Sequence, residues 1–316
     1  MGMEIRQLHN FSRIAEVGNL TRAASLLGLT QAALSRQVAQ LEAELGTVLF
    51  KRNGRGLVLT DAGQRLLAHV PIILRQIAAA TRAVRGDEGP VQGTLVLGLP
   101  PSLARTSVVP LIDAFRERLP AVTLRTVDGL SANLVEMVET GKLDCSVVYN
   151  QPPSDLVEMR LICEEDLYLV SGPAAGDNGK APPRTLALAD IAGLPLVTAG
   201  NTNVIHVALA TAMAAVGLEP QVAHEIENLS AILDLVQRGY GSSVIPLSGV
   251  HSCIGNPELT LHRIGKPSSL RCSLSVVRPV RTLDDALIEQ GTSLISEVVR
   301  QQLAVFHANV ERSIDA

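Results

Sequence analysis

Aromatic residues are scarce in this 316-residue chain: they make up 2% of it, and tryptophan is absent. Proteins that bind RNA or single-stranded DNA stack bases on aromatic side chains, so the composition argues against that class. The chain also has no apolar run long enough to span a membrane, and its first residues lack the apolar core of a signal peptide. These absences predict a cytoplasmic protein.

Cysteine is also scarce, and the spacing of the four thiols matches neither a zinc site nor a CxxC redox motif. We expect reduced, buried thiols. A peroxide-sensing pair is the alternative, but no feature of the sequence favours it. The thiols are Cys145, Cys163, Cys253 and Cys272.

Motifs of catalysis are missing as well. The sequence contains no GxSxG, HExxH, Walker-type or dinucleotide-binding pattern. Its histidines are scattered without the spacing of an orienting carboxylate, so we expect structural or surface roles for them. The histidines are His9, His69, His206, His224, His251, His262 and His307. We therefore predict that the protein is not an enzyme and that it has no catalytic residue, no bound metal and no cofactor.

Charge is distributed unevenly along the chain, whose net charge is −4. Residues 1–86 hold eleven Lys and Arg against five Asp and Glu, whereas the remainder is acidic. A basic block on an acidic body indicates a polyanionic partner for the first block, or a charged surface that serves only solubility. Hydrophobic residues make up 47%, enough for sizeable cores in two or three domains.

Three helical patterns fill the start of the basic block. Apolar residues recur at helical spacing from Ile5 to Ile14, and Gly18 ends that run. Thr21 is the expected N-cap of a short second helix, and Gly28 permits the positive φ of a tight turn. A third helix is expected from Thr30, its N-cap, to about Leu45.

The third helix has two contrasting sides. Its leucines and Val38 face one way, whereas the opposite side is small, polar and basic. Such a helix can lie in the major groove of DNA, where arginine reads guanine and glutamine reads base edges. Solvated helix surface is the alternative for each residue. The candidate DNA contacts on this helix are Thr30, Gln31, Ala32, Ser35, Arg36 and Gln40.

Two short apolar segments then flank the turn Asn53-Gly54-Arg55-Gly56, a pattern typical of a β-hairpin. The hairpin carries Lys51, Arg52 and Arg55. We predict a wing that contacts phosphates or enters the minor groove. A structural hairpin with incidental charge is the alternative.

Residues 3–65 resemble the DNA-binding domain of LysR-type transcriptional regulators. Family proteins often have proline where this chain has Ala32, so the local DNA contact is less predictable. The matching segments are Leu20-Thr21-Arg22-Ala23-Ala24, the run Leu29–Val38, Leu41-Glu42, Leu45-Gly46, Leu49-Phe50 and Leu59-Thr60-Asp61-Ala62-Gly63. The resemblance implies a winged helix-turn-helix at 1–60, a linker helix with a hinge at 61–89, and an effector-binding domain at 90–316.

The linker shows a heptad pattern, at spacings of four and three residues, that suits a two-helix coiled coil. Packing of this helix on its own domain is the alternative. In the resembled family the helix pairs two subunits, so we expect a dimer or tetramer. The seam residues are Leu66, Val70, Ile73, Ile77, Ala80 and Val84.

Strand and helix patterns alternate from residue 94 onward, which predicts an α/β fold with a largely parallel sheet. The resemblance implies a domain like periplasmic binding proteins, with two α/β lobes and an effector cleft between them. We place lobe one at 93–163 and 270–307, and lobe two at 164–268. The chain is expected to cross between them near 151–163 and 266–274.

Helix starts present free amides that bind anions, and in the resembled family such starts face the cleft. An N-capping role is the alternative for each hydroxyl and amide. The candidate effector contacts are Pro101, Ser102, Ser131, Tyr149, Thr198, Asn201, Thr202 and Asn203. Arg105, Arg125 and Arg160 are candidates for a cleft arginine, but the sequence does not place any of them.

These patterns together predict a sequence-specific DNA-binding regulator controlled by a small-molecule effector. A carboxylate is a candidate for the effector. The expected partners are double-stranded DNA, the effector and further copies of the chain, with RNA polymerase as another candidate and no membrane. A transporter's binding protein would explain only the lobes, and it would require a signal peptide. An enzyme would require a clustered catalytic site.

Overall fold

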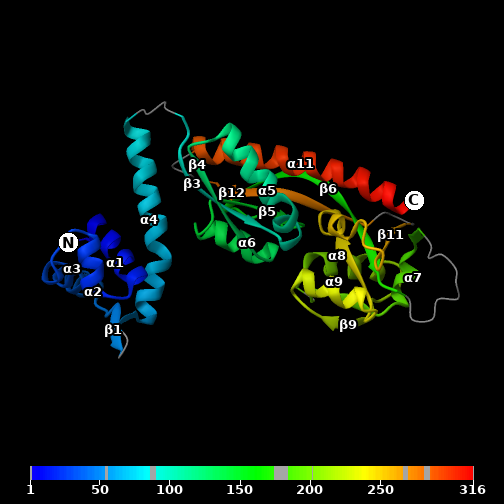
Figure 1. Cartoon of the computed structure of the whole chain (residues 1–316), viewed down its shortest axis with the longest axis horizontal. Coiled ribbons are helices and arrows are strands. Elements are labelled where there is room, and N and C mark those ends of the chain that lie inside the picture. The colour runs from blue at the N-terminus through cyan, green and yellow to red at the C-terminus, as the bar shows by residue number, and fades with distance from the viewer. Residues whose placement is uncertain are drawn as a thin grey trace. The chain divides into compact units, whose positions relative to one another are not determined.

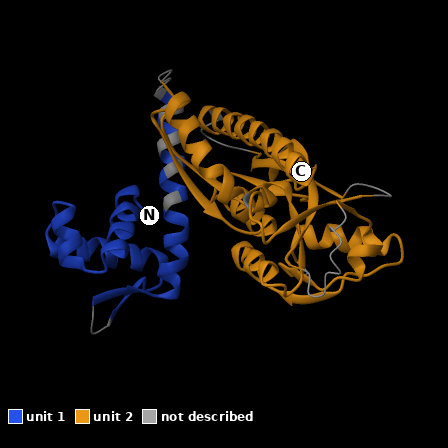
Figure 2. Ribbon diagram, turned by 45° about the vertical axis from the view of Figure 1, so that its right-hand side comes forward, with its two compact units in different colours: residues 1–89 blue, residues 90–316 orange. Residues whose placement is uncertain are grey.

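The computed structural model describes residues 2–53, 56–85, 90–173, 184–200, 202–265, 270–280 and 285–315. The chain divides into two compact units, Met1–Gly89 and Pro90–Ala316 (Figures 1 and 2). Each unit has its own hydrophobic core, as expected for independently folded domains.

The described residues of the first unit form four helices and a hairpin. Its core centres on Phe11, Ile14, Leu34 and Leu41, all at most 1% exposed. The elements are α1 (Ile5–Val17), α2 (Leu20–Leu26), α3 (Gln31–Leu45), β1 (Phe50–Asn53), β2 (Gly56–Leu59) and α4 (Asp61–Arg85). β1 and β2 pair antiparallel, so the unit is a three-helix core followed by a wing and a long helix.

Helix capping differs from expectation at one of two starts. Thr30 caps α3 as predicted, because its Oγ1 accepts a hydrogen bond from the Ala33 N–H at 3.2 Å. The prediction of Thr21 as the cap of α2 is wrong. Asn19 has the extended backbone of an N-cap, and its Oδ1 accepts from the Arg22 N–H at 3.0 Å. α2 therefore begins at residue 20, and Thr21 lies inside it.

The predicted seam on α4 is only partly free. Val70 is 0% exposed within the core of the first unit, and Leu66 and Ile73 pack against the same core. Val84, near the end of the helix, is 89% exposed. The first half of the seam is thus a contact within one chain. The prediction that the whole seam pairs with a second subunit is wrong for this half.

The second unit has two lobes, each built on parallel strands. In lobe one β3 pairs with β4 and β5 in parallel, and helices connect the strands. The elements are β3 (Gly93–Leu99), α5 (Pro101–Arg118), β4 (Val122–Asp128), α6 (Ser131–Glu139) and β5 (Cys145–Tyr149). This is the βαβαβ series expected from the sequence.

In lobe two β8 pairs in parallel with β9 and β10. β7 and β11 form a further parallel pair at the other side. The elements are β7 (Thr185–Leu186), α7 (Leu188–Ala192), β8 (Leu196–Thr198), α8 (Val204–Ala214), β9 (Val222–Glu225), α9 (Leu229–Gln237), β10 (Ser242–Pro246), α10 (Leu247–Val250), the short 3-10 helix His251–Cys253, and β11 (Thr260–Ile264).

One strand belongs to both lobes. β6 (Val157–Ser171) pairs antiparallel with β12 (Arg271–Pro279) over Val157–Asp166, and then with β10 and β11 over its last residues. The strands run β4-β3-β5-β12-β6-β10-β8-β9. The sheets are therefore mixed, because β6 and β12 pair antiparallel with each other and with the neighbouring parallel strands. We expected a crossing in this region but no continuous strand of 15 residues.

The final helix, α11 (Asp285–Asp315), extends further than the expected end near residue 307. It contacts α5 and β3 of lobe one and α10 and β11 of lobe two, and Figure 1 shows it running along both. α11 and β6 are thus two structural links between the lobes.

The burial of Val70 predicts a stability effect. Val70→Ala should destabilise the first unit by about 2 kcal/mol, because it opens a cavity in a packed core. Denaturation of the full chain, followed by hydrogen exchange in the first unit, measures the loss. Val84→Ala is the control and should leave this stability nearly unchanged. Equal effects of the two substitutions would contradict the assignment of the two halves of α4.

Candidate functional site

The outer side of α3 is free in the first unit. Leu34 and Leu41 are buried beneath it, and Val38 is half-buried. The predicted DNA contacts on α3 are all exposed: Gln31, Ala32, Ser35, Arg36 and Gln40. The structure therefore brings them to one accessible helix face, as a major-groove reader requires.

The position of α3 is fixed by polar contacts that the sequence did not reveal. The Asn10 side chain on α1 donates a hydrogen bond to the Gln37 side chain. Near the end of α3, Glu42 Oε1 accepts from the N–H groups of Leu49 (2.7 Å) and Phe50 (3.2 Å). Glu42 thereby ties the reading helix to the hairpin, so the two surfaces are held in a fixed relation.

The wing presents Lys51 and Arg52 to solvent, whereas Arg55 lies outside the described residues. Gly56 (φ +145°) leads into β2, and the Leu57 N–H donates to Gly18 O at 2.9 Å. A Cβ on Gly56 would lie 2.8 Å from that same oxygen, so glycine is required for this close approach.

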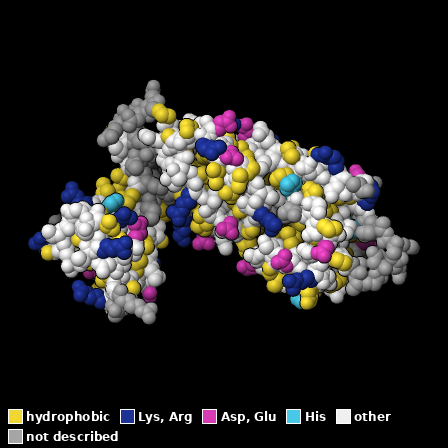
Figure 3. Space-filling view, in the orientation of Figure 1, with side chains coloured by type: hydrophobic (Ala, Val, Ile, Leu, Met, Phe, Trp, Pro, Cys, Tyr) yellow, Lys and Arg dark blue, Asp and Glu magenta, His cyan; other side chains and the backbone are white. Residues whose placement is uncertain are grey.

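A groove of about 260 Å³ joins these parts of the first unit, and Thr21, Gln31 and Arg52 contribute to its lining. In Figure 3, dark blue side chains prevail on the visible surface of the first unit, whereas the second unit shows both signs. A groove with an arginine in its lining, beside an exposed helix, can accept a phosphate backbone.

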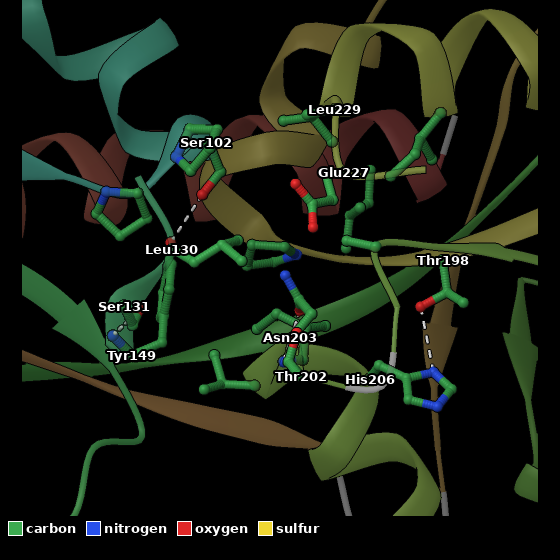
Figure 4. A pocket seen from close by; sticks show the side chains of 18 of the residues that line it. Ser102, Leu130, Ser131, Tyr149, Thr198, Thr202, Asn203, His206, Glu227 and Leu229 are labelled. Atoms are coloured by element: carbon green, nitrogen blue, oxygen red, sulfur yellow. Dashed lines mark hydrogen bonds between the residues drawn. The ribbon is translucent and has the colours of Figure 1, made fainter. Parts of the chain in front are cut away.

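The second unit contains a cleft between its lobes, at the carboxyl ends of β3, β5 and β8, with a volume of about 90 Å³. Ligands of open α/β sheets bind at such strand ends. The side chains lining this cleft are shown in Figure 4. The lining comes from the starts of α5, α6, α8 and α9 and from β10, so both lobes contribute.

The structure brings seven of the eight candidate effector residues into this lining: Pro101, Ser102, Ser131, Tyr149, Thr198, Thr202 and Asn203. Asn201 lies outside the described residues. Several of the seven also make hydrogen bonds within the protein itself. Asn203 Oδ1 caps α8 by accepting from the Ile205 N–H at 2.9 Å, and Ser131 Oγ accepts from the Tyr149 N–H at 3.1 Å.

Other lining residues were missed by the sequence reasoning. His206 is 8% exposed, and its Nδ1 is hydrogen-bonded to Thr198 Oγ1 at 3.1 Å. Glu227 precedes α9, and Ser243 on β10 is 2% exposed. A single histidine or glutamate carries no spacing signal, so only the fold could place these residues in the cleft.

A buried polar network lies behind the lobe-one wall of the cleft. Tyr149 Oη is hydrogen-bonded to Ser102 Oγ (3.1 Å) and to Ser248 Oγ (2.9 Å). The Ser248 N–H in turn donates to Glu165 Oε2 at 3.0 Å. Glu165 lies on β6 and is 2% exposed, so the network links the cleft wall to the shared strand.

Burial determines the ionisation of this network. It raises the pKa of Glu165 to about 7, and hydrogen bonds from Tyr149 and Ser248 oppose that shift only in part. Burial, together with the nearby Glu165, holds the pKa of Tyr149 well above its ordinary value. Glu165 is thus a carboxyl group that titrates near neutral pH at the junction of the lobes.

The three arginines considered for the cleft are not among its lining residues. Arg105 donates to Ser230 Oγ at 3.1 Å, and Arg125 is exposed on β4. Arg160 pairs with Glu158 and Glu289, each at 2.8 Å. Glu227 is therefore the one carboxylate among the described lining residues, which include no lysine or arginine.

The remaining chemistry of the described residues is limited. Burial raises the pKa of Cys163 to about 11 and also raises the pKa values of Cys145 and Cys272. Because the thiolate is the reactive form, this disfavours the peroxide-sensing alternative.

Within the described residues, no group of His, Cys, Asp and Glu could hold a metal ion. None of the described helices has both the length and the apolar composition of a membrane span.

An exposed reading helix with a basic wing, together with a two-lobed cleft domain, defines a DNA-binding regulator with an effector domain. Two family models match the chain: "Bacterial regulatory helix-turn-helix protein, lysR family" over residues 5–64 and "LysR substrate binding domain" over residues 88–298. The chain therefore belongs to the LysR family of transcriptional regulators. The resemblance and the fold class predicted from the sequence are confirmed.

Among named relatives, the nitrogen assimilation regulatory protein nac of Escherichia coli K12 is 32% identical over 280 residues, which cover 88% of this chain and 90% of that protein. The regulator BudR of Raoultella terrigena is 30% identical over 279 residues, which cover 87% of this chain and 94% of that protein. Full-length CbnR, solved in a complex with its target DNA, is 27% identical and superposes with a TM-score of 0.66. The match covers 92% of this chain and 99% of CbnR. These relatives are transcriptional regulators, not enzymes.

The pKa of Glu165 predicts a pH dependence. Below pH 4.5 the Glu165 carboxyl group is protonated in both the folded and the unfolded chain. Between pH 4.5 and about 7 it is ionised in the unfolded chain but still protonated in the folded chain. The free energy of unfolding should therefore fall as pH rises across this window, by about 3 kcal/mol in total.

Glu165→Gln should remove this fall, because the glutamine side chain stays neutral. Urea denaturation of the second unit between pH 4.5 and 8 measures it. Glu164→Gln, at the exposed neighbouring position, is the control and should keep the slope. An unchanged slope in Glu165→Gln would exclude Glu165 as its source.

Proposed function

We propose that α3 reads operator DNA through its outer face and that the wing contacts the adjacent backbone. The observation that carries this proposal is the exposure of the polar residues on the outer side of α3, above the buried side chains of Leu34 and Leu41. Glu42 supports it, because it fixes the wing relative to the helix. Arg36, Gln31 and Gln40 would contact base edges, whereas Lys51 and Arg52 would contact phosphates.

Arg36→Ala tests this proposal. Loss of a base contact should weaken binding to the operator by about 1–3 kcal/mol and relax specificity at one position. Gel shifts against a set of single-base operator variants measure both effects. Arg13→Ala is the control, because Arg13 on α1 is paired with Glu16 at 2.6 Å. Uniform weakening on every operator variant would instead assign Arg36 to phosphate, and unchanged binding would count against the reading role of α3.

We also propose that the second half of α4 joins two copies of the chain. Regulators of this family are oligomeric. The first half of the seam is occupied within its own unit, whereas Val84 is 89% exposed. An apolar residue that continues a heptad pattern on an exposed helix suits a paired helix of a second copy. Two such copies would present two reading helices to one palindromic operator.

Val84→Asp should disrupt this pairing, because a charge in a helix-helix seam loses its hydration without gaining a partner. Light scattering should then report a lower mass for the chain at micromolar concentration. Gln76→Asp places the same charge on an exposed position beside the seam and should leave the mass unchanged. If Val84→Asp kept the wild-type mass, copies of the chain would have to meet elsewhere.

The cleft is proposed to hold a small-molecule effector that controls DNA binding from the cytoplasm, where bacterial DNA lies. Its walls come from both lobes, so an occupant would contact both at once. A ligand that binds one lobe arrangement better than another shifts the population toward it. The candidate contacts are Ser102, Ser131, Thr198, Thr202 and Asn203, with Tyr149 in the wall.

A further inference from the structure

We propose that the effector carries an ammonium group that pairs with Glu227 and a carboxylate that faces the helix starts, as in a small amino-acid-like zwitterion. This inference rests on the proposed effector function of the cleft. It specifies the chemical class of the ligand and assigns Glu227 as the residue that selects it.

The charge of the lining is the first argument. Among the described residues that line the cleft, Glu227 brings a carboxylate and no lysine or arginine balances it. Arg105 on α5 donates to Ser230 in the first turn of α9 and is not among the lining residues. A second carboxylate, Glu225, is exposed at the end of β9 on the same segment. A ligand with negative charge alone would therefore meet the carboxylate of Glu227 without a lysine or arginine of the lining to offset it, although the helix starts would favour it.

The direction of the side chain is the second argument. Glu227 is not the N-cap of α9, because Asn228 takes that role by accepting from the Ala231 N–H at 3.0 Å. In Figure 4 the Glu227 carboxylate points toward the side of the cleft where Asn203 lies, whereas the Ser102 hydroxyl is directed at Tyr149. Glu227 is thus available to a ligand rather than committed to its own helix.

The opposite end of the ligand follows from the helix starts. α5, α6 and α8 begin at the cleft with Ser102, Ser131 and Asn203 in the lining. Their free amides favour an anionic group. A carboxylate at this end and an ammonium at Glu227 would satisfy both, and the cleft volume of about 90 Å³ restricts the ligand to a small molecule.

The test uses the full-length chain and a bacterial metabolite extract separated by ion exchange into an amine-containing pool, an anionic pool and a neutral pool. Melting temperature is measured with each pool, because a ligand that binds the native state raises it. Active fractions of the amine pool are then compared in wild type, Glu227→Gln and the matched control Glu225→Gln. A second series uses defined probes: amino acids, the corresponding carboxylates without the amine, and the corresponding amines without the carboxylate.

We expect the amine pool to stabilise the wild type and Glu225→Gln, and Glu227→Gln to bind the active fraction roughly tenfold to a hundredfold more weakly, as for loss of a charged hydrogen-bond partner. Stabilisation by the anionic or neutral pool alone, or undiminished binding by Glu227→Gln, would overturn this inference and leave the effector function standing. Absence of any shift in a chain that still binds its operator would overturn the effector function itself.

Discussion

The sharing of β6 between the two lobes determines the architecture of the second unit. Its first residues extend the sheet of lobe one through β12, and its last residues pair with β10 and β11 of lobe two. Because one strand runs through both sheets, the carboxyl ends of their parallel strands meet at a common cleft. Glu165 lies on this strand and, through Ser248 and Tyr149, connects it to the cleft wall. The binding surface and the joint between the lobes are therefore parts of one hydrogen-bonded structure.

The first unit shows what local patterns predict well. Apolar spacing and the Thr30 hydroxyl predicted the start, the end and the exposed side of α3, because a helix must bury one face and satisfy its first amides. The same spacing could not tell whether α4 packs on its own domain or on another copy, since both partners select leucine and valine at the same positions. Only the burial of Val70 in the core of the first unit decides that point.

The cleft shows where local patterns fail. Serines and asparagine at helix starts were predictable because they follow strand ends in a βαβ series. Glu165 was not, because a fully buried carboxyl group contradicts the usual rule for burial and depends on partners 83 residues away in sequence. β6 was also missed, since Glu164-Glu165-Asp166 interrupts its apolar pattern. Glu227 stands before an ordinary helix, and its role depends on which other charges the fold brings near it.

α11 adds a mechanical consequence. Arg118 and Glu297 join it to lobe one at 2.7 Å, and Arg263 and Glu311 join it to lobe two at 2.6 Å. Separation of the lobes would therefore break contacts at one end of α11, and it would also strain β6, which runs through both sheets. Any movement of the lobes on ligand binding would therefore act against two continuous elements, α11 and β6, rather than about a flexible joint.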